Sequence, residues 1–233
     1  MKYILCLLIF VFGIQFSLSQ EVYTKSYYVW AKSGLSFRNS PDKNANKLTV
    51  IPYGSEIALI SYSSETYTVT EFNGFQYTTN WAKVSYNNQI GYAFSGYLSV
   101  IKPPKISENY SIEDYLNDYF TKTGMTTYSK YENCNSKNKL DCISSGLISY
   151  KEGINYTFWN GEGGGTNTLS IPKLNILQAY TLGTIFCPSY KDFKISYTEK
   201  PLPTIIVLRD DVGCDFTVTI LGDYAIIHWS AGC

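Results

Sequence analysis

Short runs of β-forming residues, each closed by a turn signal, dominate the first half of this 233-residue chain. Apolar and polar side chains alternate in Leu35-Ser36-Phe37-Arg38, which is the pattern of a half-buried strand. Asn73 and Gly74 both tolerate positive φ, which predicts a tight hairpin turn. Runs spaced in this way are typical of a small all-β barrel. They are Thr49–Ile51, Glu56–Tyr62, Tyr67–Phe72, Trp81–Tyr86 and Ile90–Phe94.

Four sequence blocks follow one another here in the order found in a known family. Gly34-Leu35-Ser36-Phe37-Arg38-Asn39-Ser40-Pro41 is similar to the family's G-L-N-V-R-x-x-P motif, and Tyr53-Gly54-Ser55-Glu56-Ile57 to its K-G-T-x-V turn and strand. Asn80-Trp81-Ala82-Lys83-Val84 resembles G-W-x-K-V, and Asn88-Gln89-Ile90-Gly91-Tyr92-Ala93 resembles G-x-x-G-W-V. Residues 29–100 therefore resemble a bacterial SH3 (SH3b) domain. The resemblance implies an N-terminal all-β SH3-like small barrel.

Two departures from the family pattern bear on ligand binding. The segment between Tyr62 and Asn80 is long for the family, which predicts an extended hairpin that projects from the barrel. The family's second tryptophan is replaced by Tyr92. Trp81, Tyr92 and Tyr97 are the candidate ligand-binding residues, because exposed aromatic rings can line a groove for a peptide or glycan. The alternative is that these rings belong to the core or its rim.

The first residues have the pattern of a secretory signal peptide. Lys2 precedes an apolar run from Tyr3 to Phe16, and the small residues Ser17 and Ser19 follow. We therefore predict a signal peptide over residues 1–19 and an exported protein, periplasmic or secreted and associated with the cell envelope. The run is short for a membrane span, which needs about 20 apolar residues, so no transmembrane span is expected after cleavage. An uncleaved anchor and a lipoprotein are the alternatives.

Export changes the meaning of the cysteines, because disulfides persist in oxidising compartments. After the predicted signal peptide, the first half of the chain has no cysteine. The odd number in the second half leaves one thiol free or paired outside the chain. We favour a local Cys134–Cys142 bridge and a second pair drawn from the other three, although other connectivities remain open. The five candidates are Cys134, Cys142, Cys187, Cys214 and Cys233.

The double proline at Pro103-Pro104 separates the two halves, because consecutive prolines favour an extended spacer. Residues 101–105 are the expected linker, and residues 106–233 an α+β disulfide-containing domain with an antiparallel sheet and two helices. One helix begins after the N-cap Ser111 and has Gly124 as its C-cap, and a second spans 174–186. Strands are expected at 142–150, 155–159, 194–197, 204–208, 216–221 and 224–229.

Motifs that could carry chemistry are weak in this half. The lone histidine, His228, could pair with a cysteine, but a structural role is favoured. Gly161–Thr166 lacks the spacing of a phosphate-binding loop, and a turn or mobile lid is favoured. Asp210-Asp211 and Asp215 lack the EF-hand layout, and Glu152 with Glu162 could form a glycosidase pair only at a suitable separation. We predict no catalytic residues, no metal and no cofactor.

Composition excludes one class of partner. Lysine plus arginine equals aspartate plus glutamate at 19 each, and the only arginines are Arg38 and Arg209. A nucleic-acid partner is therefore not expected, because phosphate binding needs clustered cations.

The expected function is that of an exported, non-catalytic binding protein of the bacterial cell envelope. The SH3b resemblance implies recognition of a cell-wall peptide or glycan, or of an envelope protein. Two alternatives stay open. One is a cell-envelope hydrolase with an SH3b targeting module, and the other is a secreted inhibitor or effector that acts on a foreign protein.

Overall fold

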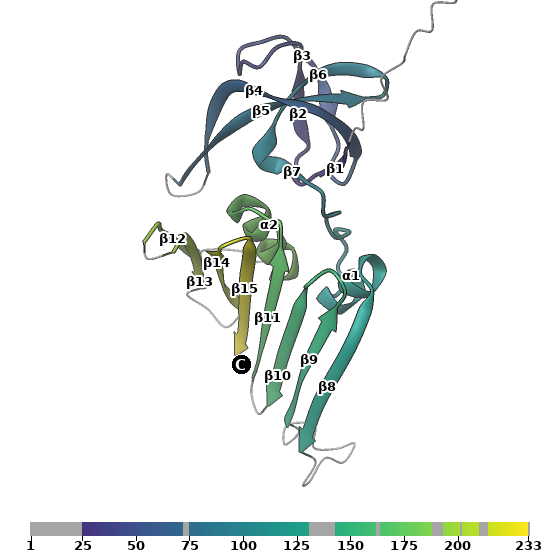
Figure 1. Cartoon of the computed structure of the whole chain (residues 1–233). Helices are drawn as coiled ribbons and strands as arrows, with labels where there is room; N and C mark the ends of the chain where they lie inside the picture. The colour runs from purple at the N-terminus through teal and green to yellow at the C-terminus, as the bar shows by residue number, and fades with distance from the viewer. Residues whose placement is uncertain are drawn as a thin grey trace, which may run out of the picture.

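A computed structural model describes residues 25–71, 75–130, 143–161, 164–187, 193–200, 202–209 and 214–232. Two antiparallel sheets follow each other along the chain, and two α-helices lie in the second half (Figure 1). Within the described residues, neither helix has the length and apolarity needed to cross a membrane. Several predictions fall outside these residues: the signal peptide, the Asn73-Gly74 turn, Glu162, Asp210-Asp211, and Cys134, Cys142 and Cys233.

The first sheet curls into a barrel, as the sequence predicted (Figure 1). Alternation along β2 places Leu35 and Phe37 in the core, whereas Ser36 and Arg38 stay partly exposed. Trp30, Ile51 and Val84 complete the centre and are fully buried. The sheet order is β3-β2-β6-β5-β4-β1-β7. The elements are β1 (Lys25–Val29), β2 (Leu35–Arg38), β3 (Lys47–Ile51), β4 (Glu56–Thr70), β5 (Gln76–Tyr86), β6 (Gln89–Phe94), the 3-10 turn η2 (Ser95–Tyr97) and β7 (Leu98–Ser99).

Strands β4 and β5 continue beyond the barrel as the expected long hairpin (Figure 1). Their outer parts stay paired from Thr66 opposite Asn80 to Thr70 opposite Gln76. Phe75, near the end of the hairpin, lies against Tyr197 of the second sheet with ring centroids 4.5 Å apart. The hairpin therefore provides one contact between the two halves.

An eight-stranded antiparallel sheet with two helices on one side forms the second half, in agreement with the expected α+β class. Its order is β12-β13-β14-β15-β11-β10-β9-β8. Helix α2 packs on β13, β14 and β15. The helices are α1 (Ile112–Tyr119) and α2 (Ile176–Phe186). The strands are β8 (Lys122–Lys130), β9 (Ile143–Tyr150), β10 (Asn155–Gly161), β11 (Gly164–Pro172), β12 (Phe193–Thr198), β13 (Thr204–Arg209), β14 (Cys214–Leu221) and β15 (Tyr224–Gly232).

Helix α1 begins where the sequence predicted and ends earlier. Ser111 and Asp114 form a reciprocal capping box. Gly124, however, is not the C-cap: the helix ends at Tyr119, Phe120 is the extended C-cap, and Gly124 lies in β8. The ring of Phe120 packs against Tyr115 at 5.6 Å, and from Lys122 onward the backbone pairs with β9. Aromatic packing and strand pairing therefore outweigh the local glycine signal.

Two polar strands, β8 and β11, were not expected from the sequence. Gly164, Gly165 and Thr166 lie in β11 rather than in a turn or mobile loop. Gly165 pairs with Asn160 of β10 on one side and with Ala231 of β15 on the other. Hydrogen bonding to two neighbouring strands compensates for the low strand propensity of glycine.

The one disulfide within the described residues joins Cys187, directly after α2, to Cys214 at the start of β14. This is one of the pairs expected from the sequence. Gly183 of α2 faces the ring of Phe216 so closely that a Cβ would collide with it. The absent side chain lets α2 approach the sheet, and the Trp229 indole donates to the Gly183 carbonyl at 3.3 Å.

Helix α2 is held against the barrel by its own cap. Asn175 and Gln178 form its capping box. Their remaining donors reach the barrel: Asn175 Nδ2 donates to the Gly96 carbonyl at 2.8 Å, and Gln178 Nε2 donates to the carbonyls of Gly96 at 3.1 Å and Leu98 at 2.9 Å. Gln178 is only 2% exposed, so these bonds are shielded from water.

The segment between the halves is hydrogen-bonded from both sides. Trp30 Nε1 donates to the Ile101 carbonyl at 2.7 Å, Tyr115 Oη to the Lys102 carbonyl at 2.8 Å, and Tyr53 Oη to the Pro104 carbonyl at 2.9 Å. The buried apolar side chains of barrel, helices and second sheet form one continuous cluster. The domain boundaries expected from the sequence stay a prediction.

The side of the second sheet that faces away from the helices is called here the open face. Strand alternation and register place its residues in rows across the strands. None of the side chains that define it is buried. On the five strands β9, β10, β11, β15 and β14 these are Ser145, Leu147, Ser149, Asn155, Thr157, Trp159, Thr166, Thr168, Ser170, Tyr224, Ile226, His228, Ser230, Asp215, Thr217, Thr219 and Leu221.

Replacement of Gln178 by Glu tests the helix cap as a clamp. The carboxylate keeps the shape but faces two carbonyl oxygens, so we expect a loss of about 2–3 kcal/mol in the free energy of unfolding at pH 7.5. Burial raises the pKa of such a carboxyl above its unfolded value of about 4.3. The folded variant then binds more protons than the unfolded chain, and the deficit grows as the pH rises above about 4. Urea unfolding at pH 4 and at pH 7.5 measures the loss of stability at each pH. The exposed Gln89→Glu serves as control, and an equal loss there would contradict the assignment.

Candidate functional site

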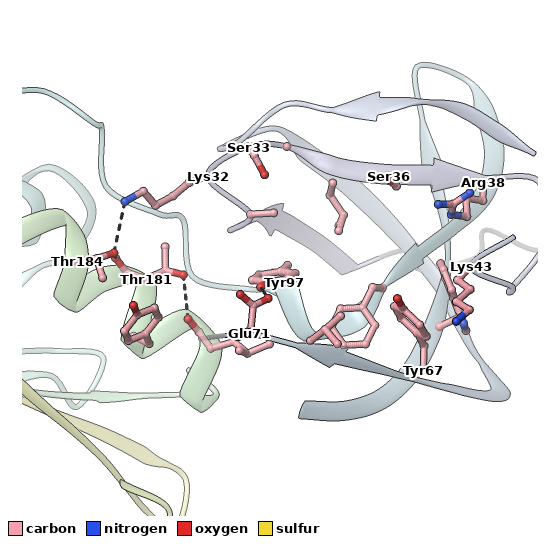
Figure 2. Close-up of a pocket in the computed structure, with 18 residues that line it drawn as sticks. Lys32, Ser33, Ser36, Arg38, Lys43, Tyr67, Glu71, Tyr97, Thr181 and Thr184 are labelled. Atoms are coloured by element: carbon pink, nitrogen blue, oxygen red, sulfur yellow. Dashed lines mark hydrogen bonds between the residues drawn. The ribbon is translucent and has the colours of Figure 1, made fainter. Parts of the chain in front are cut away.

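A cavity of about 740 Å³ opens between the barrel and helix α2 (Figure 2). The barrel supplies most of its wall, and α2 supplies the remaining side. We call it the junction groove. Its lining residues are Ala31, Lys32, Ser33, Gly34, Leu35, Ser36, Arg38, Lys43, Tyr67, Val69, Glu71, Trp81, Phe94 and Tyr97 from the barrel, with Leu177, Tyr180, Thr181 and Thr184 from α2.

A continuous series of aromatic rings lines the barrel side of the groove. Tyr67 stacks on Trp81 with ring centroids 5.6 Å apart and meets Phe94 edge-on at 5.7 Å. Phe94 in turn contacts Tyr97 at 6.0 Å. Because these rings are packed on one another, they form a rigid surface. Trp81 and Phe94 are almost fully buried, whereas Tyr67 and Tyr97 are half-buried and offer more of their rings to the groove.

The centre of the groove is polar. The Tyr97 hydroxyl donates to the carboxylate of Glu71, which follows β4 directly. Burial, reinforced by this carboxylate, raises the pKa of Tyr97 well above its ordinary value. Burial and the same carboxylate raise the pKa of Tyr180 on α2 to about 12. Both phenols therefore stay protonated at neutral pH and remain hydrogen-bond donors.

Cations stand at the two ends of the groove, with Glu71 and Tyr97 between them (Figure 2). Lys32 lies at the α2 end, where its Nζ is 3.5 Å from Thr184 Oγ1. The approach of α2 removes water from part of this side chain and lowers the pKa of Lys32. Arg38 and Lys43 lie at the far end. Arg38 donates to the Ala45 carbonyl at 2.7 Å, which fixes the loop that carries Lys43.

A second cavity of about 640 Å³ adjoins the groove. The two cavities share Lys43, Tyr67 and Trp81. The second one adds the carboxylates of Asp42 and Glu65. A ligand longer than the first cavity could therefore extend past the Tyr67–Trp81 pair.

The lining of the groove can bind a ligand. An aromatic wall, protonated phenols and separated cations can hold a ligand that carries several carboxylates. The residues considered for chemistry lie elsewhere: His228 is on the open face with its Nδ1 2.8 Å from Thr168 Oγ1, and Cys187 and Cys214 are joined to each other. Within the described part of the chain, no three metal-ligating side chains come together.

The structure places the three predicted ligand-binding residues differently. Trp81 and Tyr97 line the junction groove. Tyr92 lies on β6 in register between Arg38 and Lys83 and is not part of the groove wall. Whether these side chains contact a ligand stays a prediction.

Sequence reasoning missed Tyr67, Glu71 and the whole contribution of α2. Tyr67 and Glu71 lie in the long hairpin segment, for which the family motifs gave no guide. For α2 one signal was present, because this helix is apolar on nearly all sides and its residues 176–179 and 181–183 are all buried. A helix of that kind must be covered on more than one face.

A double-mutant cycle tests the polar centre. Glu71→Gln removes the charge of the acceptor and Tyr97→Phe removes the donor hydroxyl, so we expect a coupling free energy of about 1–2 kcal/mol. Urea unfolding of the four proteins at neutral pH measures it. Glu65→Gln combined with Tyr97→Phe is the control pair and should be additive. Additive behaviour of the Glu71 pair would show that the carboxylate charge does not strengthen this hydrogen bond.

The comparisons with known proteins concern the barrel. The family model of the bacterial SH3 domain matches residues 33–99. No curated protein and no solved structure gives a significant match to the chain. The matched span runs from the loop before β2 to β7. It includes all barrel residues that line the groove except Ala31 and Lys32. Residues 33–99 are thus identified as a bacterial SH3 domain, as the four sequence blocks predicted.

Proposed function

We propose that the protein is an exported, non-catalytic binding protein of the bacterial cell envelope, and that its junction groove binds an acidic peptide of the cell wall. Bacterial SH3 domains generally bind cell-wall components. The observation that carries the proposal is the distribution of charge in the groove: Lys32 lies at one end, Arg38 and Lys43 at the other, and Glu71 between them. The Cys187–Cys214 disulfide supports a periplasmic or secreted location.

The distribution of charge favours a peptide over an unsubstituted glycan. Cell-wall stem peptides carry several carboxylates and a free amine, and these match the separated cations and the central Glu71. The Tyr97 hydroxyl, which donates its proton to Glu71, can accept a hydrogen bond from a peptide N–H. An envelope protein could present a similar acidic segment, so the ligand is defined here by its chemistry.

No specific observation favours the two alternative functions. For a hydrolase, the groove lacks a histidine and a cysteine among its lining residues. For an inhibitor or effector, no feature of the described residues points to a foreign protein as the partner.

The binding test uses the chain from residue 20 onward and the soluble peptide fraction that an amidase releases from purified peptidoglycan. We expect saturable binding that weakens with added salt, because the attraction is partly ionic. Lys43→Gln should weaken binding about 3–10-fold, equivalent to about 1 kcal/mol. Lys47→Gln, an exposed cation outside the groove, is the matched control. Absence of binding, or an equal effect of the two variants, would remove the groove from the function.

A pH titration isolates the other end of the groove. The pKa of Lys32 is lowered, so its positive charge is lost at a lower pH than that of an exposed lysine. Affinity for the acidic peptide should fall as the pH rises through this lowered pKa. In Lys32→Arg the guanidinium stays charged, and the fall should move to higher pH. An unchanged pH profile in this variant would show that Lys32 does not contact the ligand.

A further inference from the structure

Two exposed aromatic rings stand in one row of the open face, remote from the junction groove. Trp159 of β10 is 42% exposed and Tyr128 of β8 is 62% exposed. Both lie directly opposite Ser145 of β9, one on each side. The two rings are therefore two strand spacings apart, about 9–10 Å. That is close to the length of a disaccharide unit in a β-1,4-linked polysaccharide.

The indole of Trp159 lies over the end of its own strand. A Cβ at Gly161 would collide with the six-membered ring of the indole, so the absence of a side chain there lets the ring lie over the strand. Gly161 is two residues along β10 and on the same side of the sheet. The ring is thus held by the backbone beneath it and keeps one face toward solvent, which is the arrangement that stacking on a sugar ring requires.

On the central strands of the open face, hydroxyl groups predominate over charged groups. The row of Trp159 continues with Thr166 and Ser230 on the neighbouring strands. The next row holds Thr157, Thr168, His228 and Thr217 side by side. Among the described residues that define the open face on its five central strands, Asp215 at the far end is the one charged side chain. This surface therefore differs sharply from the cation-bearing groove.

We infer that the open face binds a neutral β-1,4-linked glycan strand, with Trp159 and Tyr128 stacked on alternate sugar rings. The strand runs across β8 to β11, and the serine and threonine hydroxyls beside the rings hydrogen-bond to the sugar hydroxyl and amide groups. A neutral ligand fits because, on its five central strands, the face offers many hydroxyl donors and acceptors and one charged side chain, Asp215. The site is independent of the groove and of its peptide ligand.

Other occupants fit the face less well. A nucleic acid or an acidic polymer needs clustered cations, and the central strands of this face carry none. A membrane surface needs an apolar patch or a basic one, and hydroxyls predominate here. A second copy of the chain would pair along the free edge of β8 through its backbone, which does not require the two rings.

Tryptophan fluorescence reports on this site directly. The chain has four tryptophans, and Trp30, Trp81 and Trp229 are at most 4% exposed, so acrylamide quenches mainly Trp159. With the chain from residue 20 onward, we expect chitohexaose to bind and to protect this fluorescence from quenching. Trp159→Ala should weaken binding at least tenfold, and Tyr128→Ala by about 3–10-fold.

Three further variants separate the site from general effects on folding and from the junction groove. Gly161→Ala keeps the indole but displaces it, and should weaken binding while leaving the unfolding transition nearly unchanged. Tyr62→Ala removes an equally exposed ring from the barrel and should have no effect. Lys43→Gln should also bind chitohexaose normally, which keeps this result separate from that of the groove. The inference is overturned if chitohexaose does not bind, if Trp159→Ala binds it as the parent does, or if the rings affect only self-association.

Discussion

Three hydrogen bonds from one helix cap determine how the two halves of this protein meet. Asn175 and Gln178 close the first turn of α2, and their remaining amide protons are donated to the carbonyls of Gly96 and Leu98. Because Gln178 is buried, these bonds could be lost only by leaving polar groups without partners. The cap therefore fixes the helix to the last turn of the SH3 barrel, and the junction groove exists because of it. Tyr97, in that same turn, is part of the groove wall.

The sequence predicted the barrel better than the second half, and the reason is the range of the interactions involved. In the barrel, turn residues and alternating side chains act over a few positions, and they repeat a known motif order. In the second half, β8 and β11 consist largely of threonine, serine and glycine and have little apolar alternation. Their strand structure comes from neighbours on each side. The misplaced helix end at Gly124 has the same origin, because pairing with β9 determines where α1 stops.

For the candidate site, the sequence pointed to Trp81, Tyr92 and Tyr97 because aromatic rings can line a groove, and Trp81 and Tyr97 do line it. The motifs could not indicate that helix α2 forms the other side of the groove. The residues that α2 contributes, such as Tyr180 and Thr184, are eighty or more positions in the sequence from the nearest barrel residue of the groove, Tyr97. No local pattern specifies that distance. The open face is a similar case, since its threonines form rows only once the strands are in register.

The cystine at the end of α2 has a mechanical consequence for the groove. Cys187 follows the helix directly and is bonded to Cys214, while Thr184 lies one turn earlier beside Lys32. The disulfide thus restrains the end of α2 at which Thr184 lines the groove. Reduction would release that end while the capped end stayed attached to the barrel. The groove would then keep its barrel side and lose the fixed position of its α2 side. Ligand affinity would therefore depend on the redox state of the surroundings.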